Sequence, residues 1–183
     1  MTCPNRDGTL DSRGCIFCSA GGSGDFATAP SLSVTEQITQ AKERIRRKSN
    51  CRKFIAYFQA YTGTYAAPER LYALYHMALS HPKIIGISIA TRPDCLGDDI
   101  IDLLKELNSK KPVWVELGLQ TIHDKTAHFI RRGYELPVFE NALNRLKKAG
   151  LTVIVHVILG LPGETTDQMK DCLLYTSDAA DDL

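Results

Sequence analysis

Three cysteines near the start of the chain have the residue type and the spacing of soft-metal ligands. Cys15 and Cys18 form a C-x-x-C pair, and Cys3 precedes them in the same glycine-rich loop, residues 3–24. A C-x-x-C turn presents two thiolates to one metal centre, and glycine permits the backbone angles that such a turn needs. Because a closed structural zinc site takes four ligands, three thiolates from one loop favour an iron–sulfur cluster with one iron left open.

The same cysteines allow two other hypotheses. A thioredoxin-type redox pair normally opens a helix after a strand, whereas a glycine-rich stretch follows Cys18 here. A structural zinc site could take Cys51 as its fourth ligand, and the chain would then be a zinc-stabilised binding module without catalysis. The polar motifs described below count against that module, because a structural zinc site does not need them.

The amino-acid composition limits the classes of protein to which the chain can belong. The chain has 183 residues, of which 44% are hydrophobic, and a formal net charge of +1, which suits one domain with a sizeable core. This charge balance indicates no strong electrostatic partner. Six cysteines, five histidines and no signal peptide predict a cytoplasmic protein rather than a disulfide scaffold. The longest apolar run, residues 151–162, is too short to span a bilayer, so no membrane segment is expected.

Strand and helix signals alternate at about 30 to 40 residues per unit, as parallel βα repeats require. A capping box at Ser33 and Glu36 predicts the start of the first helix, and Pro68 suits the first turn of the second. Such folds place ligands at the carboxyl ends of their strands. The predicted strands are residues 53–59 (expected to be buried), 84–90, 113–119 and 152–159; later helices are predicted to begin at Asp98, Thr121 (as cap), Leu136 and Thr165 or Thr166.

Polar residues and glycines gather at the ends of these predicted strands. Arg92 follows the second strand and could pair with a carboxylate. Glu116 lies inside an apolar strand, where a carboxylate is costly without a partner, and this position favours a functional role. Another glycine-rich turn follows the fourth strand, where Gly160 and Gly163 let the backbone approach a flat ligand.

In its cysteine loop the chain resembles the radical S-adenosylmethionine (SAM) superfamily, with the spacing C-x(11)-C-x(2)-C in place of the more familiar C-x(3)-C-x(2)-C. The words CPNRDG, GCIFC and SGDFA are similar to those of the YhcC/YtqA-type subgroup. A wider likeness, over roughly residues 2–170, extends to the elongator catalytic subunit and the oxygen-independent coproporphyrinogen dehydrogenases. The resemblance implies an α/β fold, a partial (β/α)6 TIM-like barrel truncated at both ends.

The resemblance also implies the cofactors. Cys3, Cys15 and Cys18 would bind a [4Fe-4S] cluster, whose open iron binds SAM through its amino and carboxylate groups. One electron from a flavodoxin- or ferredoxin-like donor would then cleave SAM to methionine and a 5′-deoxyadenosyl radical. The substrate is unknown; analogy with the elongator group suggests tRNA, at the level of the fold alone. A fragment of this kind could bind the cluster and yet turn nothing over.

Several residues match SAM-binding positions of the superfamily. Gln120, in the segment V-E-L-G-L-Q-T, would hold polar groups of SAM, and Arg132 would meet its carboxylate. The turn G-L-P-G-E-T would flank the adenine. His156 is expected to be a satisfied barrel histidine, and Cys95 is not expected to be a cluster ligand. The full set of candidate cofactor-binding residues is Gln59, Tyr61, Thr62, Arg92, Glu116, Gln120, Arg132, Gly160, Gly163 and Glu164.

The end of the sequence differs in character from the rest. Residues 173–183 lack the apolar period of the preceding helices and resemble translated sequencing-adapter read-through. We therefore expect a partial radical SAM domain over residues 1–172 and a non-native tail over 173–183 that packs on nothing. A genuine acidic helix end is the alternative.

Overall fold

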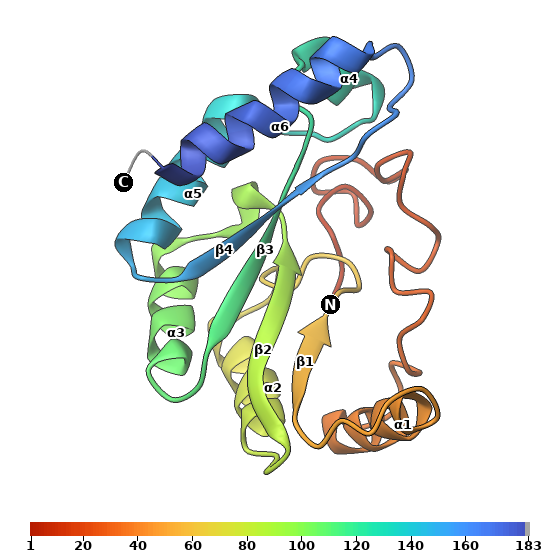
Figure 1. Cartoon of the computed structure of the whole chain (residues 1–183), viewed down its shortest axis with the longest axis vertical. Helices are drawn as coiled ribbons and strands as arrows, with labels where there is room; N and C mark the ends of the chain where they lie inside the picture. Colours follow the sequence, from red (N-terminus) through yellow and green to blue (C-terminus); the bar gives the residue numbers. More distant parts are fainter. Residues whose placement is uncertain (182–183) are drawn as a thin grey trace.

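A parallel sheet of four strands forms the centre of the computed structural model, which describes residues 1–181 and side chains as far as residue 177. The strands lie side by side in chain order, and every neighbouring pair is parallel (Figure 1). Their bounds are β1 Phe54–Phe58, β2 Ile84–Thr91, β3 Val113–Gln120 and β4 Thr152–Val157. The predicted α/β class with parallel βα repeats is confirmed, and the four-stranded sheet is not closed.

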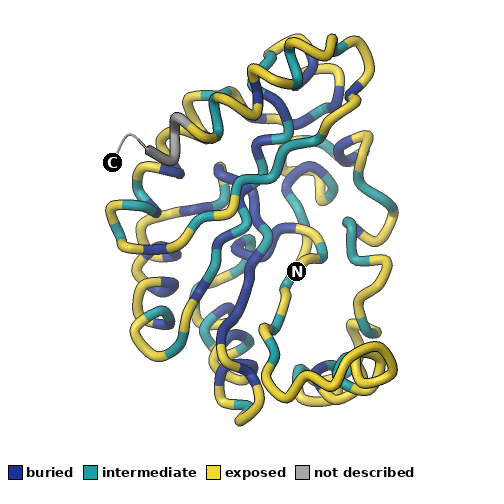
Figure 2. Tube along the Cα trace, viewed as in Figure 1, coloured by how far each residue is buried: buried dark blue, intermediate teal, exposed yellow. Residues whose placement is uncertain are grey.

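Helices connect the strands and pack on one face of the sheet. The apolar residues of β3 that point toward them, Val113, Val115 and Leu117, are at most 1% exposed. Figure 2 shows buried residues concentrated in β2, β3 and the inner faces of these helices. The helices are α1 Val34–Arg46, α2 Pro68–Leu79, α3 Asp98–Asn108, α4 Asp124–Phe129, α5 Leu136–Lys148 and α6 Thr166–Asp181, with a short 3-10 helix, η1, at Pro93–Cys95.

Most of the predicted helix starts are confirmed. Ser33 caps α1 through a complete capping box with Glu36, and Pro68 stands in the first turn of α2. Thr121 was expected to cap α4, and this expectation is wrong: the cap residue is His123. The Thr121 hydroxyl instead accepts a hydrogen bond from the His123 backbone N–H at 3.1 Å, so the chain turns once more before the helix begins.

The expectation of a buried first strand is also wrong. Ile55 and Tyr57 of β1 are 49% and 46% exposed, whereas the alternate residues pack against the helices. Strand side chains point to opposite faces in turn, and the face that carries Ile55 and Tyr57 has no helix layer in the described part of the chain. Ile154 of β4, 42% exposed, belongs to the same open face.

Packing continues past Cys172. Helix α6 runs on to Asp181, and Tyr175 is half-buried against the core, with its hydroxyl donating to Glu140 Oε1 at 2.7 Å. The expectation that residues after 172 pack on nothing is therefore wrong at Tyr175. The division of the chain at residue 172 and the non-native origin of the segment remain predictions, and residues 182 and 183 lie outside the described part. None of the helices described is long and apolar enough to cross a membrane.

We predict that Tyr175→Ala lowers the free energy of unfolding by about 1–2 kcal/mol, because it removes a half-buried ring and its hydrogen bond. Tyr175→Phe should cost about half as much, since only the bond to Glu140 is lost. Leu174→Ala is the matched control, because that neighbour is 61% exposed. Urea unfolding measures all three; equal stability of Tyr175→Ala and the parent would show that the segment does not stabilise the domain.

Candidate functional site

The cysteine loop packs on the carboxyl ends of the strands. Its two ends and its middle are tied to that edge by backbone hydrogen bonds. The Thr62 N–H donates to the Thr2 carbonyl at 3.2 Å and the Tyr61 N–H to the Gly22 carbonyl at 2.8 Å, so both ends of the loop meet the chain just after β1. The Ile16 N–H donates to the carbonyl of Ile130 at 3.1 Å, just after α4. The thiols are thus held where parallel βα folds bind ligands.

Asn5 joins the loop to the turn after α4. It is 2% exposed, and its Nδ2 donates to the carbonyls of Arg131 and Arg132 at 2.8 and 3.1 Å and to Cys15 Sγ at 3.3 Å. A Cβ on Gly133 would lie 2.7 Å from Asn5 Oδ1, so glycine leaves the room that this contact needs. Sequence reasoning missed Asn5, because its residue type alone indicates only a turn.

The three loop thiols are free, and two of them are adjacent. A hydrogen bond with Cys18, together with burial, raises the pKa of the Cys15 thiol, and the same bond lowers the pKa of Cys18 to about 6. A thiolate is the form that binds metal. Cys3 stands within electrostatic reach of Arg92 and Cys95 instead. No group of three His, Cys, Asp or Glu side chains is arranged to hold a metal ion in the described part of the chain.

Arg132 is almost fully enclosed beneath this loop, with 1% exposure. Its guanidinium donates to the carbonyls of Leu119, Thr121 and Tyr134 at 2.8, 2.6 and 3.0 Å. Burial lowers the pKa of Arg132, but an arginine stays charged at neutral pH. Its Nη2 has no hydrogen-bond partner among the described residues. Buried donors without a partner are rare in folded proteins, and a bound polar or anionic group is one way to satisfy such a donor.

Arg92 also contacts the Tyr134 ring. Its guanidinium carbon is 5.0 Å from the ring centroid, and that of Arg132 is 4.6 Å away. Arg92 forms a two-pronged ion pair with Asp94, at 2.7 and 2.9 Å, and donates to the Arg132 carbonyl at 2.8 Å. The bond to Asp94 offsets burial and raises the pKa of Arg92. Two candidate arginines thus share one aromatic ring below the thiols.

Gln120 and Thr62 complete this part of the edge. Gln120 ends β3 with φ of +64°, and its Oε1 accepts from the Tyr134 hydroxyl at 3.0 Å. Thr62 is fully buried, and its Oγ1 has no partner among the described residues. Tyr61, also at φ of +64°, donates its hydroxyl hydrogen to the Ala20 carbonyl at 3.2 Å. Five predicted positions, including the two arginines, therefore lie at this edge, and two of them carry unpartnered polar atoms.

The turn after β4 is more open. Glu164 Oε1 accepts from the Thr121 hydroxyl at 2.5 Å, which ties this turn to the end of β3. Gly160 and Gly163 have φ of +80° and +89°, and no described atom lies within 4 Å of a Cβ placed on either. Their conformation, rather than crowding by the protein, requires glycine. Gln59 is exposed, and its side chain has no hydrogen bond to another described residue.

Glu116 lies apart from the other candidate cofactor-binding residues. It lies four residues before Gln120, about 13 Å along the strand, on the open face of the sheet. Its Oε2 accepts from the Tyr57 hydroxyl at 2.7 Å and pairs with His156 Nε2 at 2.9 Å, while Oε1 accepts from Ser88. His156 is paired through Nε2, and its Nδ1 has no partner in the described part of the chain. The alternation of residues along a strand indicates the face on which Glu116 lies, but not how far along the strand it is from the cofactor-binding residues. The sequence alone therefore grouped Glu116 with them.

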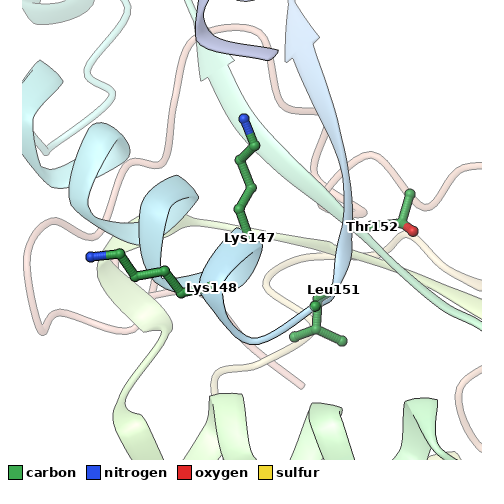
Figure 3. A pocket seen from close by; sticks show the side chains of 5 residues that line it. Lys147, Lys148, Leu151 and Thr152 are labelled. Carbon is green, nitrogen blue, oxygen red and sulfur yellow. The ribbon is translucent and has the colours of Figure 1, made fainter. Parts of the chain in front are cut away.

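Two shallow pockets lie on the surface. Figure 3 shows the first, where Lys147 and Lys148 end α5 and Leu151 and Thr152 lead into β4. This is the amino end of the strand, opposite to the thiols. The second lies between η1 and α5 on the outer surface. The first pocket contains none of the candidate residues, whereas the second includes Asp94, the ion-pair partner of Arg92.

We predict that Asn5→Ala lowers the free energy of unfolding by about 2 kcal/mol, because the buried carbonyls of Arg131 and Arg132 lose a donor. Asn141→Ala is the control, since Asn141 is exposed on α5. Urea unfolding of the metal-free protein measures both. Equal effects of the two substitutions would mean that Asn5 does not anchor the loop.

Comparisons with known proteins agree with this geometry. The profile of the Radical SAM superfamily matches residues 12–175. YtqA of Bacillus subtilis (strain 168) is 46% identical over 176 residues, which are 96% of this chain and 55% of YtqA. A tRNA uridine(34) acetyltransferase of Methanocaldococcus jannaschii is 33% identical over 88 residues, 48% of this chain and 16% of that protein.

Among solved structures, archaeal Elp3 of Methanocaldococcus infernus matches with a TM-score of 0.60 and 20% identity, covering 77% of this chain and 36% of Elp3. Identity at this level supports the fold alone. The chain spans about half the length of YtqA. The match of the family profile over most of the sequence, with a cysteine loop at the carboxyl edge of a parallel sheet, shows that the chain belongs to the radical SAM superfamily.

Proposed function

We propose that this chain is the cofactor-binding part of a radical SAM iron–sulfur enzyme, with Cys3, Cys15 and Cys18 as ligands of a [4Fe-4S] cluster. The observation that carries the proposal is the anchored loop: three free thiols on the carboxyl edge, above two buried and unpartnered polar atoms. Thiolates suit the cluster, and the unpartnered donors suit the polar groups of SAM. When bound, the cluster and SAM would supply a 5′-deoxyadenosyl radical.

The residues of the chain have distinct roles in this proposal. Asn5 positions Cys15 and donates an N–H to its sulfur. Arg6 holds the far side of the C-x-x-C turn by donating to the carbonyls of Cys18 and Ser19 at 3.1 and 2.6 Å. Gln120, Arg92 and Arg132 would orient SAM through its amino and carboxylate groups. The loop, packed over the strand ends, would keep water from a reactive radical.

The proposal extends to partners and location. A cytoplasmic flavodoxin- or ferredoxin-like protein would supply the electron. The match to a tRNA uridine(34) acetyltransferase supports tRNA as the substrate. This support covers about half of the chain, so the tRNA assignment is a separate claim from the cofactor assignment and needs its own test.

The zinc-module alternative is less well supported. Its fourth ligand would be Cys51, which is exposed and lies 2.8 Å from the Ser49 hydroxyl. Cys51 precedes the start of β1, whereas the cysteine loop packs at the end of that strand. The length of a strand therefore separates Cys51 from the other thiols.

We predict that Cys3→Ala, Cys15→Ala and Cys18→Ala each lose most of the iron that the parent binds after anaerobic reconstitution, because cluster iron is held by thiolates. Cys51→Ala and Cys95→Ala are the controls and should keep it. The EPR spectrum of the reduced parent should also change when SAM is added. Loss of iron in Cys51→Ala, with no effect of SAM on the parent spectrum, would indicate a closed four-cysteine site.

We also predict that Gln120→Ala weakens SAM binding about tenfold while iron content stays unchanged, since one polar partner is lost. Gln40→Ala, an exposed change on α1, is the matched control. Equilibrium dialysis of labelled SAM against reconstituted protein measures both affinities. Arg132→Ala should weaken SAM binding too, and it should also lower thermal stability, because three carbonyls lose their donor. Unchanged SAM affinity in both variants would remove these residues from the site.

A further inference from the structure

Four side chains from four different strands meet on the open face of the sheet: Tyr57 of β1, Ser88 of β2, Glu116 of β3 and His156 of β4. We infer that this face cluster is a substrate subsite that holds a nucleobase by an N–H group on its edge. The inference rests on the proposed function, because it names the part of a tRNA substrate that the enzyme would engage. Testing the inference requires neither the iron–sulfur cluster nor SAM.

Glu116 organises the face cluster and is itself fully engaged. Both of its oxygens accept hydrogen bonds, Oε1 from Ser88 and Oε2 from Tyr57 at 2.7 Å, and Oε2 also lies 2.9 Å from His156 Nε2. Its side chain is 13% exposed. A buried carboxylate needs such partners, so the carboxylate fixes the donors in place and has little capacity left for a ligand.

The outward-facing atoms of the cluster are hydrogen-bond acceptors. His156 Nε2 lies 2.9 Å from Glu116 Oε2, and the other ring nitrogen, Nδ1, has no partner in the described part of the chain; with the ring proton on Nε2, Nδ1 carries a lone pair. Burial and the bond to Glu116 raise the pKa of Tyr57, so the phenol stays protonated. It donates to Glu116 and presents its oxygen lone pairs outward. His156 and Tyr57 are 43% and 46% exposed, respectively, and a ligand can reach them.

The surroundings of the cluster favour a flat ring. Trp114 lies two residues before Glu116 on the same face, and a Cβ on Gly86 would be 2.6 Å from its ring, so the indole packs directly over the glycine. Ile55 and Ile154 expose apolar surface on either side, at 49% and 42%. Bases are held in proteins by stacking on such surfaces and by hydrogen bonds to their edges. This face therefore suits a ligand with a flat ring that lies between the apolar side chains and carries an N–H donor on its edge.

The face cluster and the candidate cofactor-binding residues lie at different positions along the strands. Glu116 lies about 13 Å along β3 from Gln120, while the cysteine loop packs beyond the strand ends. A group bound at the cluster would therefore face the edge without displacing SAM. This arrangement suits a second reactant better than a part of the cofactor.

Trp114, the single tryptophan of the chain, provides the test. We expect uridine to change its fluorescence saturably in the protein without metal, and 3-methyluridine, which lacks the N3–H, to bind at least tenfold more weakly. His156→Ala and Tyr57→Phe should each weaken uridine binding about tenfold. The matched controls are His128→Ala, on exposed α4, and Tyr72→Phe, on α2, and circular dichroism checks that each variant is folded.

Three results would overturn the inference: no saturable change with uridine, equal binding of uridine and 3-methyluridine, or tighter binding of argininamide than of uridine. The last would assign the site to a cation that pairs with Glu116. Because no cofactor is present in this experiment, its failure is distinct from failure of the proposed function, which iron content and the effect of SAM decide.

Discussion

The enclosed guanidinium of Arg132 is the interaction on which the arrangement of the carboxyl edge depends. A buried charge is tolerated only when its donors are paired, and Arg132 pairs with carbonyls at the end of β3 and in the turn after α4. Its own carbonyl accepts from Arg92 and from Asn5. The second strand end, the third strand end and the cysteine loop thus converge on one residue.

This convergence explains how a loop without regular secondary structure can present thiols at a defined place. Asn5 donates hydrogen bonds both to the Arg132 carbonyl and to Cys15 Sγ, so the turn at Arg132 fixes the position of Cys15. Arg6 fixes the other side of the C-x-x-C turn. The remaining donor of Arg132, Nη2, is left without a described partner in an otherwise satisfied environment. Arg132 therefore donates hydrogen bonds to the surrounding backbone and keeps one donor that a polar ligand could use.

The two faces of the sheet carry different parts of the structure. The helix-covered face holds a continuous apolar core that includes Leu71, Ile87 and Leu104, and it supplies the stability of the domain through burial. The open face carries the network of Glu116, where hydrogen bonds rather than apolar packing connect the strands. The rigid parallel sheet keeps this network and the carboxyl edge at a fixed separation.

Local signals in the sequence determined much of the fold. The capping box at Ser33, the proline at Pro68 and the alternation of strand and helix depend on neighbours within a few residues, and the C-x-x-C pair and the strand-end motifs were visible for the same reason. Contacts between distant residues were decided only by the tertiary structure. Asn5 meets Arg131 across 126 positions and Tyr57 meets Glu116 across 59, and no periodicity encodes such pairs. The exposure of β1 and the packing of Tyr175 likewise depend on which element covers a face, and that is set by the assembled fold.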